Sequence, residues 1–180
     1  MKIVKTHQEK FSDSTFIGKR YKDADRINGS FGHLWSLWFK SGWFKILEDQ
    51  LESIRPNLEP DAVTDGSYLG WMHACPNFEY WIGMLFPAGT KAPDGFEAVD
   101  IPSAAYAISW LYGREDTGEL FGMDAHNRSV EAAAALGLKV CESDAVAFER
   151  YQCPRYTTPD ENGNVILDYG IKLADTSLRI

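Results

Sequence analysis

The order of the predicted secondary-structure elements repeats along this chain of 180 residues: a strand, a helix and a hairpin of two strands occur twice. The first unit covers about 14–86, the second about 98–173, and a connector rich in turn-forming residues covers 87–97. Strands joined by hairpins pair antiparallel, and each helix must bury an apolar face. The sequence therefore predicts one α+β domain over residues 1–180. Its duplicated strand-helix-strand-strand units form an antiparallel sheet with two helices on one face and a central cleft.

In the first unit, apolar residues recur every three or four positions between Phe31 and Leu51. This spacing predicts an amphipathic helix, with an interruption around Ser41-Gly42. The other elements are runs rich in β-branched and aromatic residues, and a Pro-Asn turn separates the two runs of the hairpin. They cover 14–21, 68–75 and 78–86.

The second unit repeats this order without matching the first residue by residue. A strand is predicted over 101–113, and a helix over roughly 118–136 has Thr117 as its cap and Gly137 as its stop. The hairpin strands are predicted at 145–152 and 165–173, separated by the turn-forming run Asp160–Asn164.

Charge and aromatic content narrow the class of partner. The formal net charge is −8, and the 18 Lys and Arg residues are scattered, which disfavours direct binding of nucleic acid. An acidic protein instead attracts cations. Six Trp, eight Tyr and ten Phe are more than a core of this size needs, and Trp and Tyr suit flat ligands. The predicted partner is a small aromatic, cationic molecule.

The remaining signals indicate a cytoplasmic protein without cofactors. The three cysteines form no C-x-x-C pair, the chain opens with polar residues rather than a secretory leader, and no apolar run is long enough to span a bilayer. We therefore expect a reducing, cytoplasmic location and no membrane partner. The four His residues lack metal-ligand spacing, and the sequence has neither a Walker loop nor a dinucleotide fingerprint, so neither a metal nor another cofactor is expected.

Three segments in this order carry a resemblance to a known family: Ile101–Ala107, Phe148–Tyr151 and Leu167–Leu173. Together they resemble the GyrI-like family, also called the bacterial transcription-activator effector-binding domain, over about Phe16 to Leu173. The resemblance implies a duplicated fold with a central cleft. In multidrug-sensing relatives, lipophilic cations stack on aromatic rings and meet a buried Glu in the penultimate strand, and the matching position here is Glu149.

The chain departs from the family pattern in two respects. Only about 14 residues precede the first predicted strand, so no helix-turn-helix is expected and direct transcriptional control is in doubt. The small-residue-then-Gly pattern before the fourth strand appears as Ser103-Ala104-Ala105, without Gly. Some free-standing relatives hydrolyse cyclopropyl-bearing alkylating natural products, which the resemblance offers as an alternative activity.

Glu149 is the candidate anchor, because a carboxylate in a β-forming segment is costly to bury unless a positive charge pairs with it. The alternative without a binding role is that Glu149 faces solvent or pairs with a neighbouring Lys or Arg. Strand alternation places Ala147, Glu149 and Tyr151 on one face, but it leaves open which face meets the cleft. The candidate ligand-binding residues are Glu149, Tyr151, Trp110, Tyr112, Trp81, Tyr68, Trp71, Trp38 and Phe39.

Three functions are compatible with this pattern. The first is a binding module that senses or sequesters a hydrophobic aromatic cation, with Glu149 neutralising its charge. The second is a hydrolase that opens a strained cyclopropyl ring, with Glu149 as the catalytic general acid or base. The third is a protein-interaction role, such as shielding a topoisomerase. The Trp43-Phe44 pair either closes over the cleft or buries a homodimer contact.

Overall fold

A computed structural model describes residues 1–57, 65–74, 76–152 and 154–175. In this part of the chain, eight strands form one antiparallel sheet that carries three α-helices. The strands are β1 (Lys2–Phe11), β2 (Ser14–Lys22), β3 (Tyr68–His73), β4 (Glu79–Pro87), β5 (Glu97–Ile101), β6 (Ala104–Gly113), β7 (Val146–Tyr151) and β8 (Val165–Lys172). The helices are α1 (Gly32–Lys40), α2 (Trp43–Ile54) and α3 (Met123–Ala135), with short 3-10 turns η1 (Asp23–Asp25) and η2 (Arg55–Asn57).

The predicted α+β class with an antiparallel sheet is confirmed. The strand order across the sheet is β1-β6-β8-β7-β3-β4-β2-β5, so each predicted unit contributes a neighbouring triplet, β2-β4-β3 and β6-β8-β7. The two triplets meet where β3 pairs with β7. This seam lies in the middle of the sheet, and both strands beside it come from hairpins.

Two strands were not expected. β1 pairs with β6 at one edge of the sheet, and β5 pairs with β2 at the other, so the prediction that the first strand begins near residue 14 is wrong. Both are edge strands: half of the residues of β1 and four of the five residues of β5 are exposed. Charged residues are typical of edge strands, because they discourage pairing with another chain. Because these charged residues interrupt the apolar pattern by which a strand is recognised in a sequence, β1 and β5 were not predicted.

The helices differ from the prediction in their bounds. The expected interruption is confirmed: Gly42 has a φ of 67°, a left-handed conformation that ends α1 and lets α2 begin. The second predicted helix starts later than expected, at Met123. Gly118 and Gly122 both have positive φ, which places the preceding residues in turns.

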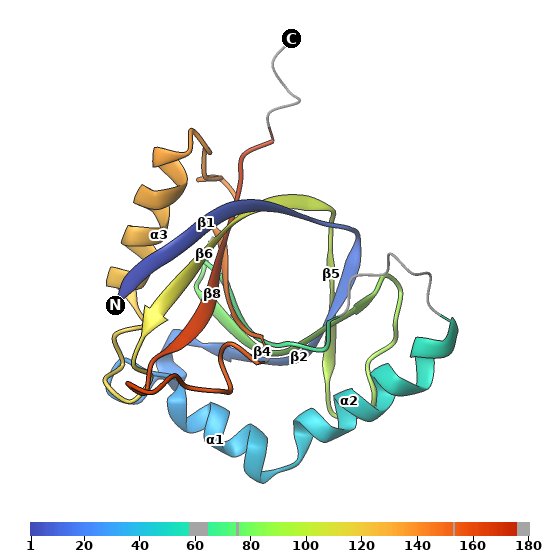
Figure 1. The fold of residues 1–180 in the computed structure, drawn as a ribbon. Coiled ribbons are helices and arrows are strands. Elements are labelled where there is room, and N and C mark those ends of the chain that lie inside the picture. Colours follow the sequence, from blue (N-terminus) through green and yellow to red (C-terminus); the bar gives the residue numbers. More distant parts are fainter. Residues whose placement is uncertain (58–64, 75, 153, 176–180) are drawn as a thin grey trace.

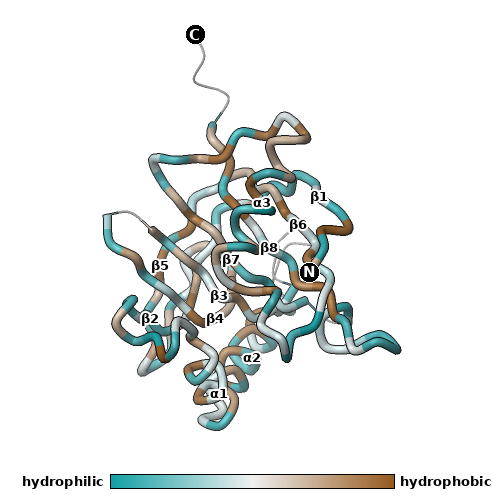
Figure 2. The backbone as a smooth tube through the Cα atoms, turned by 90° about the vertical axis from the view of Figure 1, so that its left-hand side faces the viewer, coloured by the Kyte–Doolittle hydropathy of each residue, from teal (hydrophilic) through white to brown (hydrophobic). Residues whose placement is uncertain are grey.

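The sheet curls, and the helices lie outside the curl (Figure 1). Its inner face is filled by large apolar side chains, including Trp71, Tyr106 and Phe148. On the outer face, α1 and α2 pack over β4, and α3 packs over β6 and β8. A view turned by 90° again places α1 and α2 together at one end of the molecule (Figure 2). The central strands β3, β7 and β8 lie between these two helical layers.

Candidate functional site: an acidic aromatic cleft

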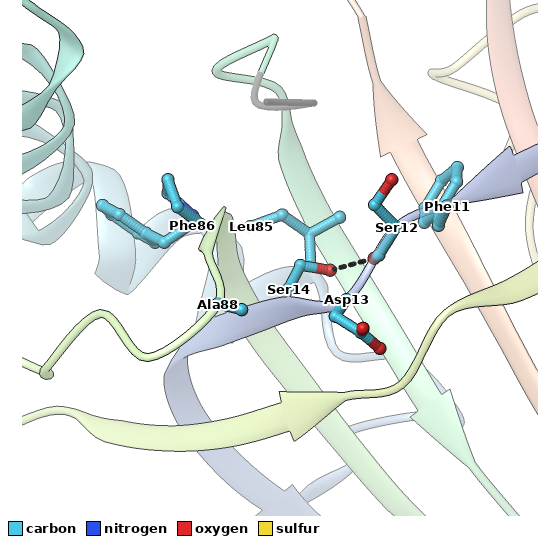
Figure 3. A pocket seen from close by; sticks show the side chains of 8 residues that line it. Phe11, Ser12, Asp13, Ser14, Leu85, Phe86 and Ala88 are labelled. Carbon is cyan, nitrogen blue, oxygen red and sulfur yellow. Dashed lines mark hydrogen bonds between the residues drawn. The ribbon is translucent and has the colours of Figure 1, made fainter. Parts of the chain in front are cut away.

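A large cleft lies on the outer face of the sheet, between α1 and α3. Its volume is about 1540 Å³. Typical small-molecule sites measure roughly 300–1,000 Å³, so this cleft has room for a bulky ligand. A second hollow, at the turn between β1 and β2, measures only about 100 Å³ (Figure 3). That hollow is too small for a drug-sized molecule, and we assign it no role.

Strand alternation places Glu149 at the base of the cleft. In β7, Glu149 and Tyr151 line the cleft, whereas Phe148 packs into the inner core. Gly70 lies directly opposite Glu149 in the β3–β7 pair. A β-carbon at Gly70 would lie 2.3 Å from the Tyr80 hydroxyl and 2.9 Å from Glu149 Oε2. The glycine therefore leaves the space that the carboxylate and the phenol occupy.

The carboxylate of Glu149 is buried and held by two phenols. Its side chain is 7% exposed, and the hydroxyls of Tyr80 and Tyr151 each donate a hydrogen bond of 3.0 Å to Oε2. Within the described residues, Glu149 forms no ion pair. Burial raises the pKa of Glu149 to about 6, although the two phenol hydrogen bonds and the charge of Arg26 lower it. The group is therefore ionised, without a direct counter-ion, at neutral pH.

The phenols of Tyr80 and Tyr151 act as hydrogen-bond donors to Glu149. Burial, together with the charge of Glu149, raises the pKa of Tyr80 and of Tyr151 well above the ordinary value, so both keep their protons. Trp35 Nε1 donates to the Tyr80 hydroxyl at 2.9 Å. Because that hydroxyl accepts from Trp35, its proton points toward Glu149, and the three side chains form a directed chain of hydrogen bonds.

Aromatic rings form the walls around this group. Phe31 stacks on Tyr80 with ring centroids 4.2 Å apart and planes 4° apart. Tyr151 contacts Trp35 at 4.4 Å and Tyr156 at 4.8 Å. All five rings line the cleft. Such faces carry negative electrostatic potential and attract cations.

The charged residues of the lining are mostly acidic. Among the described residues, the only Lys or Arg in the lining is Arg26, whose guanidinium lies 4.7 Å from the ring centroid of Phe31 and of Phe78. His126 also lines the cleft, and burial lowers its pKa. Six carboxylates face these groups, so the cleft is negative. They are Glu48, Asp65, Glu115, Asp116, Glu142 and Glu149.

Four of the nine candidate residues line the cleft: Glu149, Tyr151, Tyr68 and Phe39. Trp38 lies on the buried face of α1, and its Nε1 donates a hydrogen bond to the Tyr21 hydroxyl at 2.8 Å. Phe44, from the pair expected to act as a lid or dimer contact, is buried and stacks on Tyr68 at 3.8 Å. Trp43 packs edge-on against Trp38.

The other four candidates lie away from the cleft. Trp71 and Trp81 belong to the inner core of the curled sheet. Trp110 lies against the same cluster, with the guanidinium of Arg155 at 4.6 Å from its ring. The Tyr112 hydroxyl donates to Asp160 Oδ2 at 2.6 Å in a surface turn.

Several lining residues were not among the candidates. Trp35 belongs to the predicted first helix and Tyr80 to the predicted first hairpin, and neither is among the nine candidates. The strand register brings Tyr80 into the site. Gly70 on β3 lies opposite Glu149, and β4, the next strand, carries Tyr80 within hydrogen-bond distance of the carboxylate. The other omitted rings and the omitted arginine come from loops, apart from one tyrosine on β8. They are Arg26, Phe31, Phe78, Phe121, Tyr156 and Tyr169.

The described residues hold neither a candidate metal site nor a candidate membrane-spanning helix. They contain no group of three or more His, Cys, Asp or Glu side chains arranged to hold a metal ion. No helix in them is long and apolar enough to cross a membrane.

Comparisons with known proteins identify the fold. No protein-family model and no curated protein matches the sequence. Among solved structures, a Staphylococcus aureus protein described as a candidate bacterial transcription regulation protein matches with a TM-score of 0.63 and 14% identity, over 95% of this chain and 99% of the other. The structure of SAV2435 bound to tetraphenylphosphonium matches with a TM-score of 0.64 and 12% identity, over 95% and 94% of the two chains. At such identities, the comparisons show that this chain shares the fold of these two proteins.

Proposed function

We propose that this protein binds a bulky, hydrophobic aromatic cation in the cleft, with Glu149 as the charged anchor. The observation that carries the proposal is the buried, ionised carboxylate, whose partners among the described residues are two phenols and no cation. A ligand cation supplies the missing charge, and each ring contact contributes about 0.5–2 kcal/mol. The complex of SAV2435, a protein of similar fold, with tetraphenylphosphonium supports this ligand class.

A pair of ions with the same shape tests the proposal. Tetraphenylphosphonium and tetraphenylborate present the same four phenyl rings around opposite charges. Calorimetry at about pH 8, where Glu149 is ionised, should show the cation binding at least about tenfold more tightly than the anion. Equal affinities would mean that the cleft selects apolar area alone, and binding of neither ion would remove the proposed function.

The affinity for tetraphenylphosphonium should depend on pH through Glu149. Its pKa of about 6 means that the free protein loses the anchoring charge as the pH falls through that value. Affinity should therefore be about tenfold lower near pH 5 than near pH 8, because only about a tenth of the carboxylates are then ionised. The same titration of Glu149→Gln is the control and should be nearly flat. A variant that keeps the full pH dependence would assign the effect to another group, such as His126.

Arg26 should oppose cation binding, since it places a positive charge on the aromatic wall that a ligand would use. Replacing Arg26 with Gln should raise the affinity for tetraphenylphosphonium about threefold to tenfold, measured near pH 8.5 so that Glu149 is ionised in both proteins. Arg128→Gln is the matched control, because Arg128 is half-exposed on α3, pairs with Asp124 and does not line the cleft. Weaker binding by the Arg26 variant would contradict this role.

The hydrolytic alternative is favoured by one observation, the pKa of about 6 at Glu149, which suits a general base near neutral pH. Glu149 would take a proton from water while the oxygen attacks the electrophilic ring carbon. The departing ring carbon would take the electron pair of the broken carbon–carbon bond and receive the proton back from Glu149. Ring opening of a cyclopropyl-containing alkylating compound can be followed by the change in its absorbance. It should then be faster with the wild type than with Glu149→Gln. Equal rates in both and in buffer would exclude this activity.

A further inference from the structure

We propose that the preferred ligand is an elongated aromatic dication, with one positive centre at Glu149 and the second at Glu48. The inference rests on the proposed function and specifies its ligand class. Its basis is a second carboxylate in the cleft, held by a tyrosine in the same way as the first.

Glu48 projects from α2 and lines the cleft, and its carboxylate accepts a hydrogen bond from the Tyr68 hydroxyl. The Tyr68 ring is itself fixed, because it stacks on Phe44 with centroids 3.8 Å apart and planes 11° apart. The arrangement parallels that of Glu149 and Tyr151, in which a phenol also orients the carboxylate. A carboxylate oriented in this way loses less conformational freedom when a cation binds.

The two phenols that hold these carboxylates lie beside each other on the same face of the sheet. Tyr68 and Tyr151 are directly opposed in the β3–β7 pair, and both line the cleft. Trp35 also lines the cleft, and its ring lies 4.4 Å from Tyr151 and 5.7 Å from Phe44, the buried ring on which Tyr68 stacks. Aromatic side chains of the cleft therefore lie next to both carboxylates.

The charges near Glu48 leave it available for a ligand. The neighbouring cations pair with other carboxylates: Arg55 in η2 pairs with Glu52, and Lys45 in α2 pairs with Asp49. The hydrogen bond to Asp49 raises the pKa of Lys45 most, and the charge of Glu48 contributes less. Within the described residues, Glu48 itself forms no ion pair. A monocation at Glu149 would leave the rest of the lining strongly acidic, whereas a second positive centre would reduce that excess.

Bis-phosphonium compounds provide the test. Two triphenylphosphonium groups are joined by alkyl linkers of graded length, and methyltriphenylphosphonium is the matching monocation. At the best linker length, calorimetry should show the dication binding about tenfold more tightly, beyond the roughly twofold statistical gain from two identical heads. Glu48→Gln should abolish this gain while leaving the affinity for the monocation within about twofold.

The control variant is Glu52→Gln, one turn further along the same helix, which removes the same charge outside the cleft. It should keep the preference for the dication. The proposal is overturned if no linker length improves on the monocation, if Glu48→Gln weakens both ligands equally, or if Glu52→Gln reproduces its effect. Failure of the monocation itself to bind the wild type would instead remove the function on which this inference rests.

Discussion

Replacing Glu149 with Gln should weaken tetraphenylphosphonium binding about 100-fold at pH near 8, where the wild-type carboxylate is ionised. The substitution removes a buried charge while keeping the shape of the side chain. Its amide oxygen can still accept from Tyr80 and Tyr151, so the walls of the cleft should stay in place. The loss should appear in calorimetry as an effect on the cation alone, with tetraphenylborate binding unchanged or improved.

The same variant should be more stable than the wild type, which separates a functional carboxylate from a structural one. Burial raises the pKa of Glu149 from 4.5 to about 6, so between these values the folded protein binds more protons than the unfolded chain. The contribution of this group to stability therefore falls as the pH rises through that window. Near pH 8, Glu149→Gln should gain up to about 2 kcal/mol, and the gain should vanish below about pH 4.5.

Denaturant unfolding at the two pH values measures this difference. A variant that is destabilised near pH 8 would show that the charge of Glu149 supports the fold. Loss of cation binding would then have a structural cause, and the anchor role would fail. If Glu149 is a binding residue, Glu149→Gln should be more stable than the wild type and bind the cation more weakly. Proteins commonly lose stability where they keep a buried charge for a ligand.

The sequence was sufficient to predict the class of fold and most central strands. Their apolar and aromatic runs are long, and Gly42 marks the break between α1 and α2. The edge strand β1 was missed because its residues are mostly charged or polar and its partner strand, β6, is distant in the sequence. Such pairing is set by tertiary contacts rather than by local pattern.

The site could be predicted only in part. Alternation along β7 correctly grouped Glu149 with Tyr151, but it cannot tell the inner from the outer face of a curled sheet. In this fold both faces are buried and rich in rings, so Trp71 and Trp81 looked like cleft residues although they fill the inner core. Tyr80 needed knowledge of the register between three strands, which no local pattern in the sequence provides.

The strand that carries Glu149 is held from its other face by a buried ion-pair network. Asp168 on β8 is fully buried, and Arg150 on β7 donates to its Oδ2 from Nε at 3.1 Å and from Nη2 at 2.8 Å. Arg155 donates to the same carboxylate at 2.9 and 2.6 Å. Arg150 also makes two hydrogen bonds of 2.9 Å to Glu9 on β1. A single carboxylate thus joins β7, β8 and the loop between them.

Asp168→Asn should therefore cause a large loss of stability, about 3–5 kcal/mol, because it leaves two arginines beside a buried site without their shared negative charge. Denaturant unfolding measures the loss, and Asp160→Asn is the control, since that exposed carboxylate pairs with Tyr112 in a surface turn and should cost less than about 1 kcal/mol. The network lies on the face opposite to the cleft, so the folded fraction of Asp168→Asn should bind tetraphenylphosphonium within about threefold of the wild type. A loss below about 1 kcal/mol would show that Glu9 alone satisfies Arg150, and that β7 is positioned by its strand pairing rather than by this carboxylate.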